Sequence, residues 1–302
     1  MCNLVLLSAS VIILFFLSAS TAFTFPGATN DARECASSSK NRCGVQALTD
    51  RIVGGNLTSI DEFPWMALLS YRNEDGEDVW GCGGTLIGTR TILTAAHCLL
   101  PSLKFVRLGE HNVSSALDCQ QFASPDDIDC ADPPMDFTDF IMVHHPKWTP
   151  EKKQNDIGLI KLMKEPPVTD FIHPICLPCG EQVIVNATIA GWGATDGVDP
   201  RASTDTKMKA VLKIIELGKC QLFYRQSNIK IDNQICAGGV KGVNACRGDS
   251  GGPLMISSMN LWFVIGVVSF GPQICAYDHG VTAPSVYTRV ADYGDWIRSN
   301  MV

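Results

Sequence analysis

The chain has 302 residues, of which 46% are hydrophobic and 18% charged, and its formal net charge is −7 at pH 7. This balance predicts a folded core rather than disorder. Because the sequence holds no block of basic residues, nucleic acid is excluded from the expected partners. The length suits a leader, a short pro-segment and one domain of about 250 residues.

The first 22 residues have the features of an export signal. Leu4 to Leu17 is apolar apart from two serines, and the small residues that end at Ala22 suit cleavage there. A membrane anchor is the alternative, but the run is shorter than the ~20 residues that a span needs. We therefore predict a signal peptide over 1–22, a secreted extracellular product and no membrane association.

A polar stretch rich in Ser, Ala, Thr and Asn follows, and we predict a pro-segment over 23–51 that is too short to form a core. From Ile52 onward, short β-branched or alternating runs are separated by Gly, Pro, Asn and Asp, which is typical of an antiparallel sandwich or barrel. The clearest predicted strands are Trp65–Leu69, Thr91–Leu93, Phe105–Leu108, Ile157–Leu162, Val183–Ile189, Lys209–Ile215 and Leu261–Val268. A helical period occurs only near the end, where Val290, Tyr293 and Ile297 fall on one face.

Cysteine usage indicates the same oxidising compartment. The sequence has 13 cysteines, and Cys2 leaves with the predicted signal peptide. The remaining cysteines are even in number and can all pair, as in many secreted proteins. Three sequons, at Asn56, Asn112 and Asn186, predict glycans.

Three short motifs carry reactive side chains. His97 lies in Thr-Ala-Ala-His-Cys, Asp156 in Asn-Asp-Ile-Gly-Leu, and Ser250 in Gly-Asp-Ser-Gly-Gly-Pro. Each alone is explained as well by a buried histidine, a strand-edge aspartate or a glycine-rich turn. A serine hydroxyl, however, is a weak nucleophile until a base such as imidazole takes its proton. Together, in the order His, Asp, Ser, the motifs resemble the chymotrypsin-like (trypsin-fold) serine peptidase family, from Arg51 to the C-terminus.

The resemblance implies an all-β fold of two six-stranded antiparallel β-barrels with a C-terminal helix. That helix, over roughly 292–300, is expected to pack against the second barrel. The peptidase domain would cover 52–302 and would hydrolyse peptide bonds through an acyl-enzyme. In it, Ser250 would be the nucleophile, His97 the base and Asp156 the group that orients the base. The amides of Gly248 and Ser250 would form the oxyanion hole.

Arg51 and Ile52 open a stretch, Arg-Ile-Val-Gly-Gly, that resembles the activation site of this family. Cleavage after Arg51 would free the amine of Ile52, which would turn inward and pair with Asp249. A buried carboxylate needs such a partner, because an unpaired buried charge is costly. The resemblance therefore implies a zymogen, activated by an upstream protease that cuts after Arg, with no cofactor.

The resemblance also implies most of the disulfides. Three bridges match disulfides of the family, namely Cys82–Cys98, Cys220–Cys236 and Cys246–Cys275. A fourth, Cys119–Cys130, resembles a loop disulfide of arthropod clip-type proteases. A fifth, Cys43–Cys176, would tether the pro-segment, and Cys35–Cys179 follows by elimination. Clip-type proteases are the nearest relatives in style. Only two cysteines lie between the signal peptide and Arg51, however, so we expect no clip domain.

The substrate pocket is where the sequence departs from trypsin-like members. By resemblance its residues are Asn244, Ser269, Phe270, Gly271 and Ser285. Trypsin-like members carry Asp at the position of Asn244, and a substrate Arg or Lys would enter here without a buried counter-charge. We therefore predict a neutral P1 residue, aromatic or Leu, where P1 is the residue before the scissile bond.

No metal is expected. Glu110 resembles the start of a calcium loop in some relatives, but a disulfide loop replaces the rest of that site.

Two functions follow from the sequence. The first is a secreted serine endopeptidase in an extracellular cascade, with a protein substrate and a serpin-type inhibitor as partners. The second is a protease-fold binding or cofactor protein with negligible turnover, an alternative that the non-acidic pocket base leaves open. The presence of all three triad residues favours the first.

Overall fold

The computed structural model describes residues 43–46, 57–121, 127–178, 184–195, 203–225, 233–239, 243–272 and 283–302. Several predictions fall outside the described residues: the signal peptide, most of the pro-segment, Arg51, Ile52, Asn56, Cys35, Cys179 and Cys275. Within the described residues, none of the helices has the length and apolar character of a membrane span.

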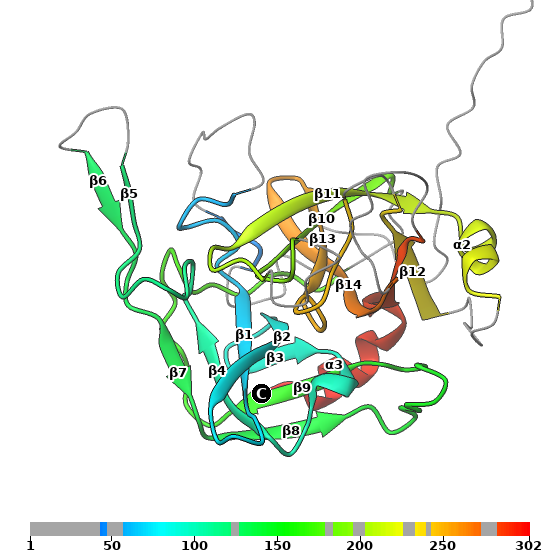
Figure 1. The fold of residues 1–302 in the computed structure, drawn as a ribbon, viewed down its shortest axis with the longest axis horizontal. Coiled ribbons are helices and arrows are strands. Elements are labelled where there is room, and N and C mark those ends of the chain that lie inside the picture. The colour runs from blue at the N-terminus through cyan, green and yellow to red at the C-terminus, as the bar shows by residue number, and fades with distance from the viewer. Residues whose placement is uncertain are drawn as a thin grey trace, which may run out of the picture.

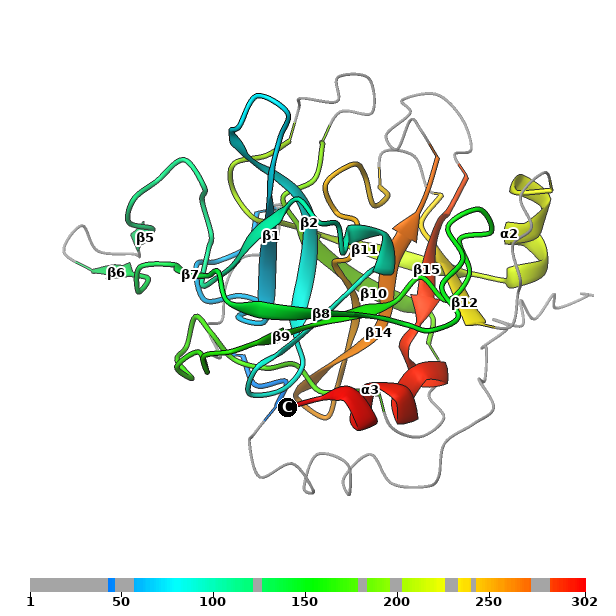
Figure 2. The same ribbon diagram turned by 90° about the horizontal axis from the view of Figure 1, so that it is seen from below.

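Two β-barrels lie side by side and make up most of the fold (Figures 1 and 2). The first contains β1 (Met66–Arg72), β2 (Asp78–Leu86), β3 (Thr91–Thr94), β4 (Leu103–Leu108), β7 (Met135–Phe137), β8 (Phe140–His144) and β9 (Gly158–Leu162). Its strands are ordered β7-β4-β1-β2-β3-β9-β8, and every pair is antiparallel. Only Thr138 and Asp139 separate β7 from β8, so one continuous segment pairs with both ends of the sheet and curls it round.

The second barrel is closed by hydrogen bonds in the order β10-β11-β12-β15-β14-β13. Its strands are β10 (Asn186–Gly191), β11 (Met208–Ile215), β12 (Gln234–Ala237), β13 (Pro253–Ser258), β14 (Leu261–Phe270) and β15 (Ser285–Arg289). Inward-facing aliphatic side chains such as Leu212, Leu254 and Val268 fill it, together with the ring of Tyr287. The predicted all-β fold of two barrels is confirmed.

The short helices are η1 (Ala96–Cys98), α2 (Leu217–Phe223), η3 (Val290–Tyr293) and α3 (Gly294–Asn300). The predicted C-terminal helix is present, and the three residues predicted to share a face are all buried. The prediction that this helix packs against the second barrel is wrong for α3. η3 contacts β14 of the second barrel, whereas α3 runs across to the first: Trp296 meets His145 there, and Thr91 bonds the last residue, Val302.

A disulfide-linked hairpin stands apart from both barrels, at the upper left of Figure 1. It consists of β5 (Cys119–Gln121) and β6 (Ile128–Cys130), which pair only with each other. All three residues of β6 are exposed, so the hairpin adds little to either core.

The two barrels contact each other along a seam that contains both polar and apolar contacts. The amide of Gly83, in β2, donates to the carbonyl of Ser250, just before β13, at 2.8 Å. Deeper in the seam, the indole N–H of Trp65 donates to the sulfur of Met255 at 3.0 Å. These two contacts hold the β1–β2 side of the first barrel against β13 of the second.

Candidate active site

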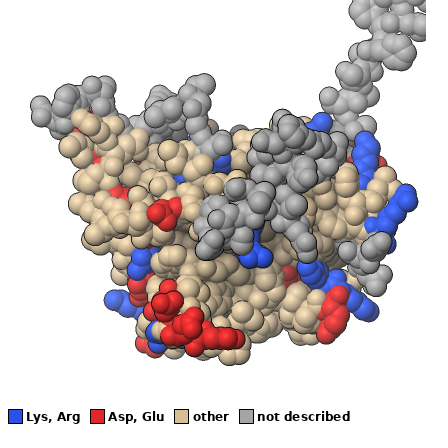
Figure 3. Space-filling view, viewed as in Figure 1, with Lys and Arg blue, Asp and Glu red and all other residues tan. Residues whose placement is uncertain are grey.

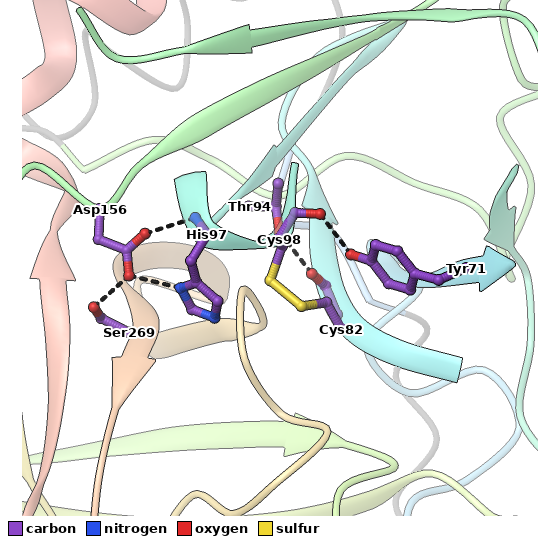
Figure 4. The surroundings of a disulfide bond; sticks show 8 residues. Tyr71, Cys82, Thr94, His97, Cys98, Asp156 and Ser269 are labelled. Carbon is purple, nitrogen blue, oxygen red and sulfur yellow. Dashed lines mark hydrogen bonds and ion pairs between the residues drawn. A yellow bond between two sulfur atoms is a disulfide. The ribbon is translucent and has the colours of Figure 1, made fainter. Parts of the chain in front are cut away.

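His97 and Asp156 lie together at one end of the first barrel (Figure 4). His97 is in η1, directly after β3, and Asp156 lies two residues before β9. Because β3 and β9 pair antiparallel, with Thr94 opposite Gly158, the end of one lies beside the start of the other. His97 Nδ1 is 2.7 Å from Asp156 Oδ2, and the His97 amide donates to Oδ1 at 3.0 Å.

Hydrogen bonds from the second barrel fix the Asp156 carboxylate, whose side chain is 1% exposed. The hydroxyl of Ser269, near the end of β14, donates to Oδ2 at 2.5 Å. The hydroxyl of Thr288, in β15, donates to the backbone carbonyl of Asp156 at 2.8 Å. A buried carboxylate held by this many donors stays oriented toward the imidazole of His97.

The disulfide between Cys82 and Cys98 anchors the residue that follows His97 (Figure 4). The Tyr71 hydroxyl also donates to the Cys98 carbonyl at 2.7 Å. Among the described residues, the one cluster with metal-ligand spacing is Cys82, His97 and Cys98. Its sulfurs are joined in a disulfide and offer no thiolate, so the cluster does not suit a metal.

Ser250 lies in a tight turn that requires glycine at two positions. Gly248 has φ +97° and Gly251 has φ +79°, and a Cβ on Gly251 would overlap Thr94 and the carbonyl of Gly83. In the described part of the chain, the amides of Gly248 and Ser250 donate to no backbone acceptor, which leaves them available to a ligand. The Ser250 hydroxyl makes no hydrogen bond to a described residue, His97 included; such contacts commonly tighten when substrate binds.

Asp249 turns away from Ser250 into the second barrel. Its carboxylate accepts from the amides of Gly193, at 3.0 Å, and Cys246, at 2.9 Å. No Lys, Arg or His among the described residues lies within ion-pair distance of it. Burial raises the pKa of Asp249 to about 6, although the two amides act in the opposite direction. A cavity of about 140 Å³ opens beside this carboxylate.

The residues predicted to form the substrate pocket gather beside Ser250. A cavity of about 420 Å³ is lined by Ser250 and by Phe270, Gly271 and Ser285 from the predicted set. Asn244 lies behind Ser285: its Oδ1 accepts from the Ser285 hydroxyl at 2.6 Å, and its Nδ2 donates to the Ala283 carbonyl at 2.9 Å. None of the described lining residues is acidic.

Four of the predicted disulfides lie within the described residues: Cys43–Cys176, Cys82–Cys98, Cys119–Cys130 and Cys220–Cys236. Cys246 is also disulfide-bonded, while its predicted partner Cys275 lies outside the described part. Next to the tether, Gly44 adds two backbone hydrogen bonds, to the Pro174 carbonyl at 2.8 Å and from the Trp262 amide at 2.9 Å.

Two sequons and Glu110 are also placed. Asn186 is exposed at the start of β10, and Asn112 lies in a turn where its Oδ1 accepts from the Ser114 hydroxyl at 2.7 Å. Glu110 is buried and pairs with Arg107 at 3.1 Å; burial raises the pKa of its carboxyl group. On the face drawn in Figure 3, basic side chains are scattered among acidic and uncharged ones.

Sequence reasoning missed part of the support for Asp156. Ser269 was predicted only as a pocket residue, and Thr288 was not predicted at all. Tyr293 was predicted only to share a helix face with Val290 and Ile297, yet its hydroxyl donates to Oδ1 of Asn155, beside Asp156, at 3.0 Å. Asn155 has φ +53°, a left-handed conformation that asparagine tolerates better than most residues. The one sequence signal for this support was the Asn that precedes Asp156 in its motif.

Comparisons with known proteins agree with this geometry. Residues 52–297 match the family model described as Trypsin. CLIP domain-containing serine protease B10 of Anopheles gambiae is 41% identical over 272 residues, which cover 86% of this chain and 72% of that protein. CLIP domain-containing serine protease HP8 of Bombyx mori is 40% identical over 306 residues, covering 95% of this chain and 78% of that protein.

A solved structure is similar as well. The crystal structure of the Drosophila Grass clip serine protease of the Toll pathway superposes with a TM-score of 0.76 at 31% identity, over 88% of this chain and 76% of that one. Sequence, fold and the arrangement of the site thus agree, and the chain belongs to the trypsin family of serine proteases.

Proposed function

We propose that this chain is a secreted serine endopeptidase, made as a zymogen and activated by cleavage after Arg51. The observation that carries the proposal is the His97–Asp156 pair, with its 2.7 Å contact, held across the barrel seam from Ser250. In this reading Ser250 attacks the scissile carbonyl, and His97 takes the serine proton and returns it to the leaving amine. Asp156 keeps Nδ1 protonated and stabilises the imidazolium.

The free amides of Gly248 and Ser250 would then bind the oxyanion of the tetrahedral intermediate. Their turn leaves both N–H groups without a backbone acceptor among the described residues. Losing one such donor typically costs about 3–4 kcal/mol of transition-state stabilisation. The arrangement suits acyl transfer better than mere binding, because a binding surface has no use for amides aimed at a developing charge.

Asp249 supports the zymogen proposal. In the uncleaved chain its buried carboxylate has only amide partners among the described residues, and its raised pKa marks a site that favours an added positive charge. The cavity beside it has room for a chain end. Insertion of the Ile52 amine would supply the missing charge and stiffen the turn between Asp249 and Ser250.

A neutral P1 residue suits the cavity beside Ser250. The Asn244 side chain is occupied by Ser285 and Ala283, and Arg247 on the rim would repel a substrate cation. Such an enzyme does not cut its own Arg51 bond, so another protease must activate it. Relatives named as CLIP-domain proteases, and a solved relative of the Toll pathway, support a place in an extracellular cascade.

P1 profiling tests the proposal. The zymogen would be cut at Arg51 with trypsin, freed of trypsin, and assayed on a peptide library that varies only P1, beside a Ser250→Ala control. Cleavage at neutral P1 residues and not at Arg is expected. Preference for Arg would overturn the neutral pocket. Turnover no higher than in Ser250→Ala would instead favour a binding or cofactor role.

A further inference from the structure

Phe270 is a fixed aromatic platform at the mouth of the substrate cavity. It ends β14 and lines the cavity together with Ser250. The Tyr224 ring meets it edge-on, with centroids 5.6 Å apart. The Tyr224 hydroxyl donates to the Pro284 carbonyl at 2.6 Å, which holds that ring in place. A substrate side chain that reaches Phe270 therefore meets a surface of defined position.

Lys153 places a positive charge over this platform. Its ammonium nitrogen is 4.9 Å from the centroid of the Phe270 ring. The backbone that carries it has φ +48°, and its carbonyl accepts from the Gln234 side chain at 3.3 Å, so the loop between β8 and β9 presents the lysine in a set place. Among the described residues, no carboxylate lies within 4.0 Å of the ammonium group.

A second cation borders the same cavity. Arg247 is exposed, lines the cavity with Phe270, and has no ion-pair partner among the described residues. The whole chain carries a net charge of −7, yet two separate segments each place a cation near the substrate cavity, Lys153 over Phe270 and Arg247 in the cavity lining. Charges of one sign around a cleft add up and attract groups of the opposite sign.

The strand edge beside Phe270 decides which substrate residues meet it. β14 pairs with β13 only as far as Val267, opposite Pro253, so that among the described residues no strand pairs with Ser269 to Gly271 on that side. An extended substrate can add to this edge as a strand. Side chains then alternate, so that P2 and P4 share one face while P1 and P3 share the other. With P1 in the cavity, P2 and P4 are the candidates for Phe270.

We propose that Lys153 selects substrates that carry Asp or Glu at P2 or P4. The inference rests on the endopeptidase function proposed above and adds to it the class of substrate. Lys153 acts by charge attraction to a carboxylate over the Phe270 ring. Arg247, which lines the same cavity, adds to the positive field. The role is one of binding and specificity, since Lys153 makes no hydrogen bond or ion pair with any of the three triad residues.

Matched peptides test the proposal. Each pair would share its P1 residue and differ only by Asp or Asn at P2, P3 or P4. Enzyme concentration would be normalised by titrating Ser250 with a fluorophosphonate. We expect kcat/KM about fivefold higher for Asp than for Asn at P2 or P4, and equal values at P3. The preference should shrink in 1 M NaCl, because exposed charges are screened there.

Variants assign the preference to one side chain. Lys153→Gln should abolish it and Lys153→Arg should retain it. Lys152→Gln makes the same charge change on the neighbouring residue and should leave the ratio as in the wild type. Equal kcat/KM for Asp and Asn at both P2 and P4, or a ratio unchanged in Lys153→Gln, would overturn the proposal. Failure of the fluorophosphonate to label Ser250 would instead overturn the endopeptidase function itself.

Discussion

At the scale of single residues, the proposed neutral P1 preference depends on Asn244, which lies behind Ser285 of the substrate cavity. Both ends of its side-chain amide make hydrogen bonds: Oδ1 accepts from Ser285, and Nδ2 donates to the Ala283 carbonyl. Asn244→Asp keeps the size of the side chain and introduces a carboxylate. We expect kcat/KM for peptides with Arg at P1 to rise by about 10²-fold or more, because a buried counter-charge then meets the guanidinium.

The change would be measured on two peptides that differ only in Arg or Leu at P1. Asn300→Asp, the same chemical change on α3, is the matched control and should alter neither rate. If the unmodified enzyme already cleaves the Arg peptide as fast as the Leu peptide, Asn244 does not exclude cations.

The buried carboxylate of Asp249 predicts a pH-dependent stability for the uncleaved chain. Its folded-state pKa, about 6, lies above the ordinary value of 3.8. A group with a raised pKa holds its proton longer when folded, so its contribution is complete below about pH 4 and is lost as the pH rises through 6. For uncleaved Ser250→Ala protein, we expect this contribution to the free energy of unfolding to fall by about 2–3 kcal/mol between pH 4 and 7.

Urea unfolding at several pH values would measure it, with the Asp249→Asn, Ser250→Ala double variant as reference. The two proteins are compared by how steeply their free energy of unfolding changes with pH. Its absolute value is not compared, because the Asn side chain also changes the bonds to Gly193 and Cys246. Parallel slopes in the two proteins would show that Asp249 already has a charge partner in the zymogen.

The motifs predicted the positions of His97, Asp156 and Ser250 because each lies in a short local pattern. Ser269 and Thr288 could not be assigned to Asp156 in the same way. Their hydroxyls reach it from β14 and β15, more than a hundred residues away in the chain. A serine or threonine inside a strand carries no local mark of such a partner.

At the scale of elements, seven predicted strands overlap observed ones, namely β1, β3, β4, β9, β10, β11 and β14. The long strand β2 was missed because its first four residues are exposed and its glycines break the apolar pattern. α3 was predicted to contact the wrong barrel. A periodic apolar face shows that a helix is covered, but not by which partner: here Trp296 and His145 decide it.

Two disulfides of different setting should have different effects when removed. Cys119–Cys130 links β5 to β6, which pair with no other strand of the described sheets, while Cys82–Cys98 joins buried residues beside His97. Because the hairpin can open locally without unfolding the barrels, replacing Cys119 and Cys130 by Ala should lower Tm by only about 2 °C. Replacing Cys82 and Cys98 should lower Tm and kcat together, because the anchor of His97 is lost.

Thermal unfolding and active-site titration on the two double variants would test this. Each double variant removes one disulfide and two sulfur atoms, so a difference between them reflects the position of the bridge. Equal losses of Tm would mean that the β5–β6 hairpin contributes to a core as much as β2 and η1 do.

At the scale of the whole molecule, the Cys43–Cys176 bridge joins the pro-segment to the barrels. After cleavage at Arg51, the two chains should migrate together without reductant and separate with it. In a Cys43→Ser, Cys176→Ser variant, retention of the segment would indicate the proposed Cys35–Cys179 pair. Its release would rule that pair out. Non-reducing electrophoresis and intact mass measure both outcomes.

The proposed neutral P1 preference, which rests on the bond between Asn244 and Ser285, has a consequence for signalling. A protease that cuts after Arg can activate its own precursor, and its output then grows exponentially once a few molecules are active. An enzyme with a neutral pocket floor cannot feed back in this way. The amount formed is then proportional to the activity of the upstream protease and to time. Such a step relays a signal in a graded manner and stops gaining active molecules when its input stops.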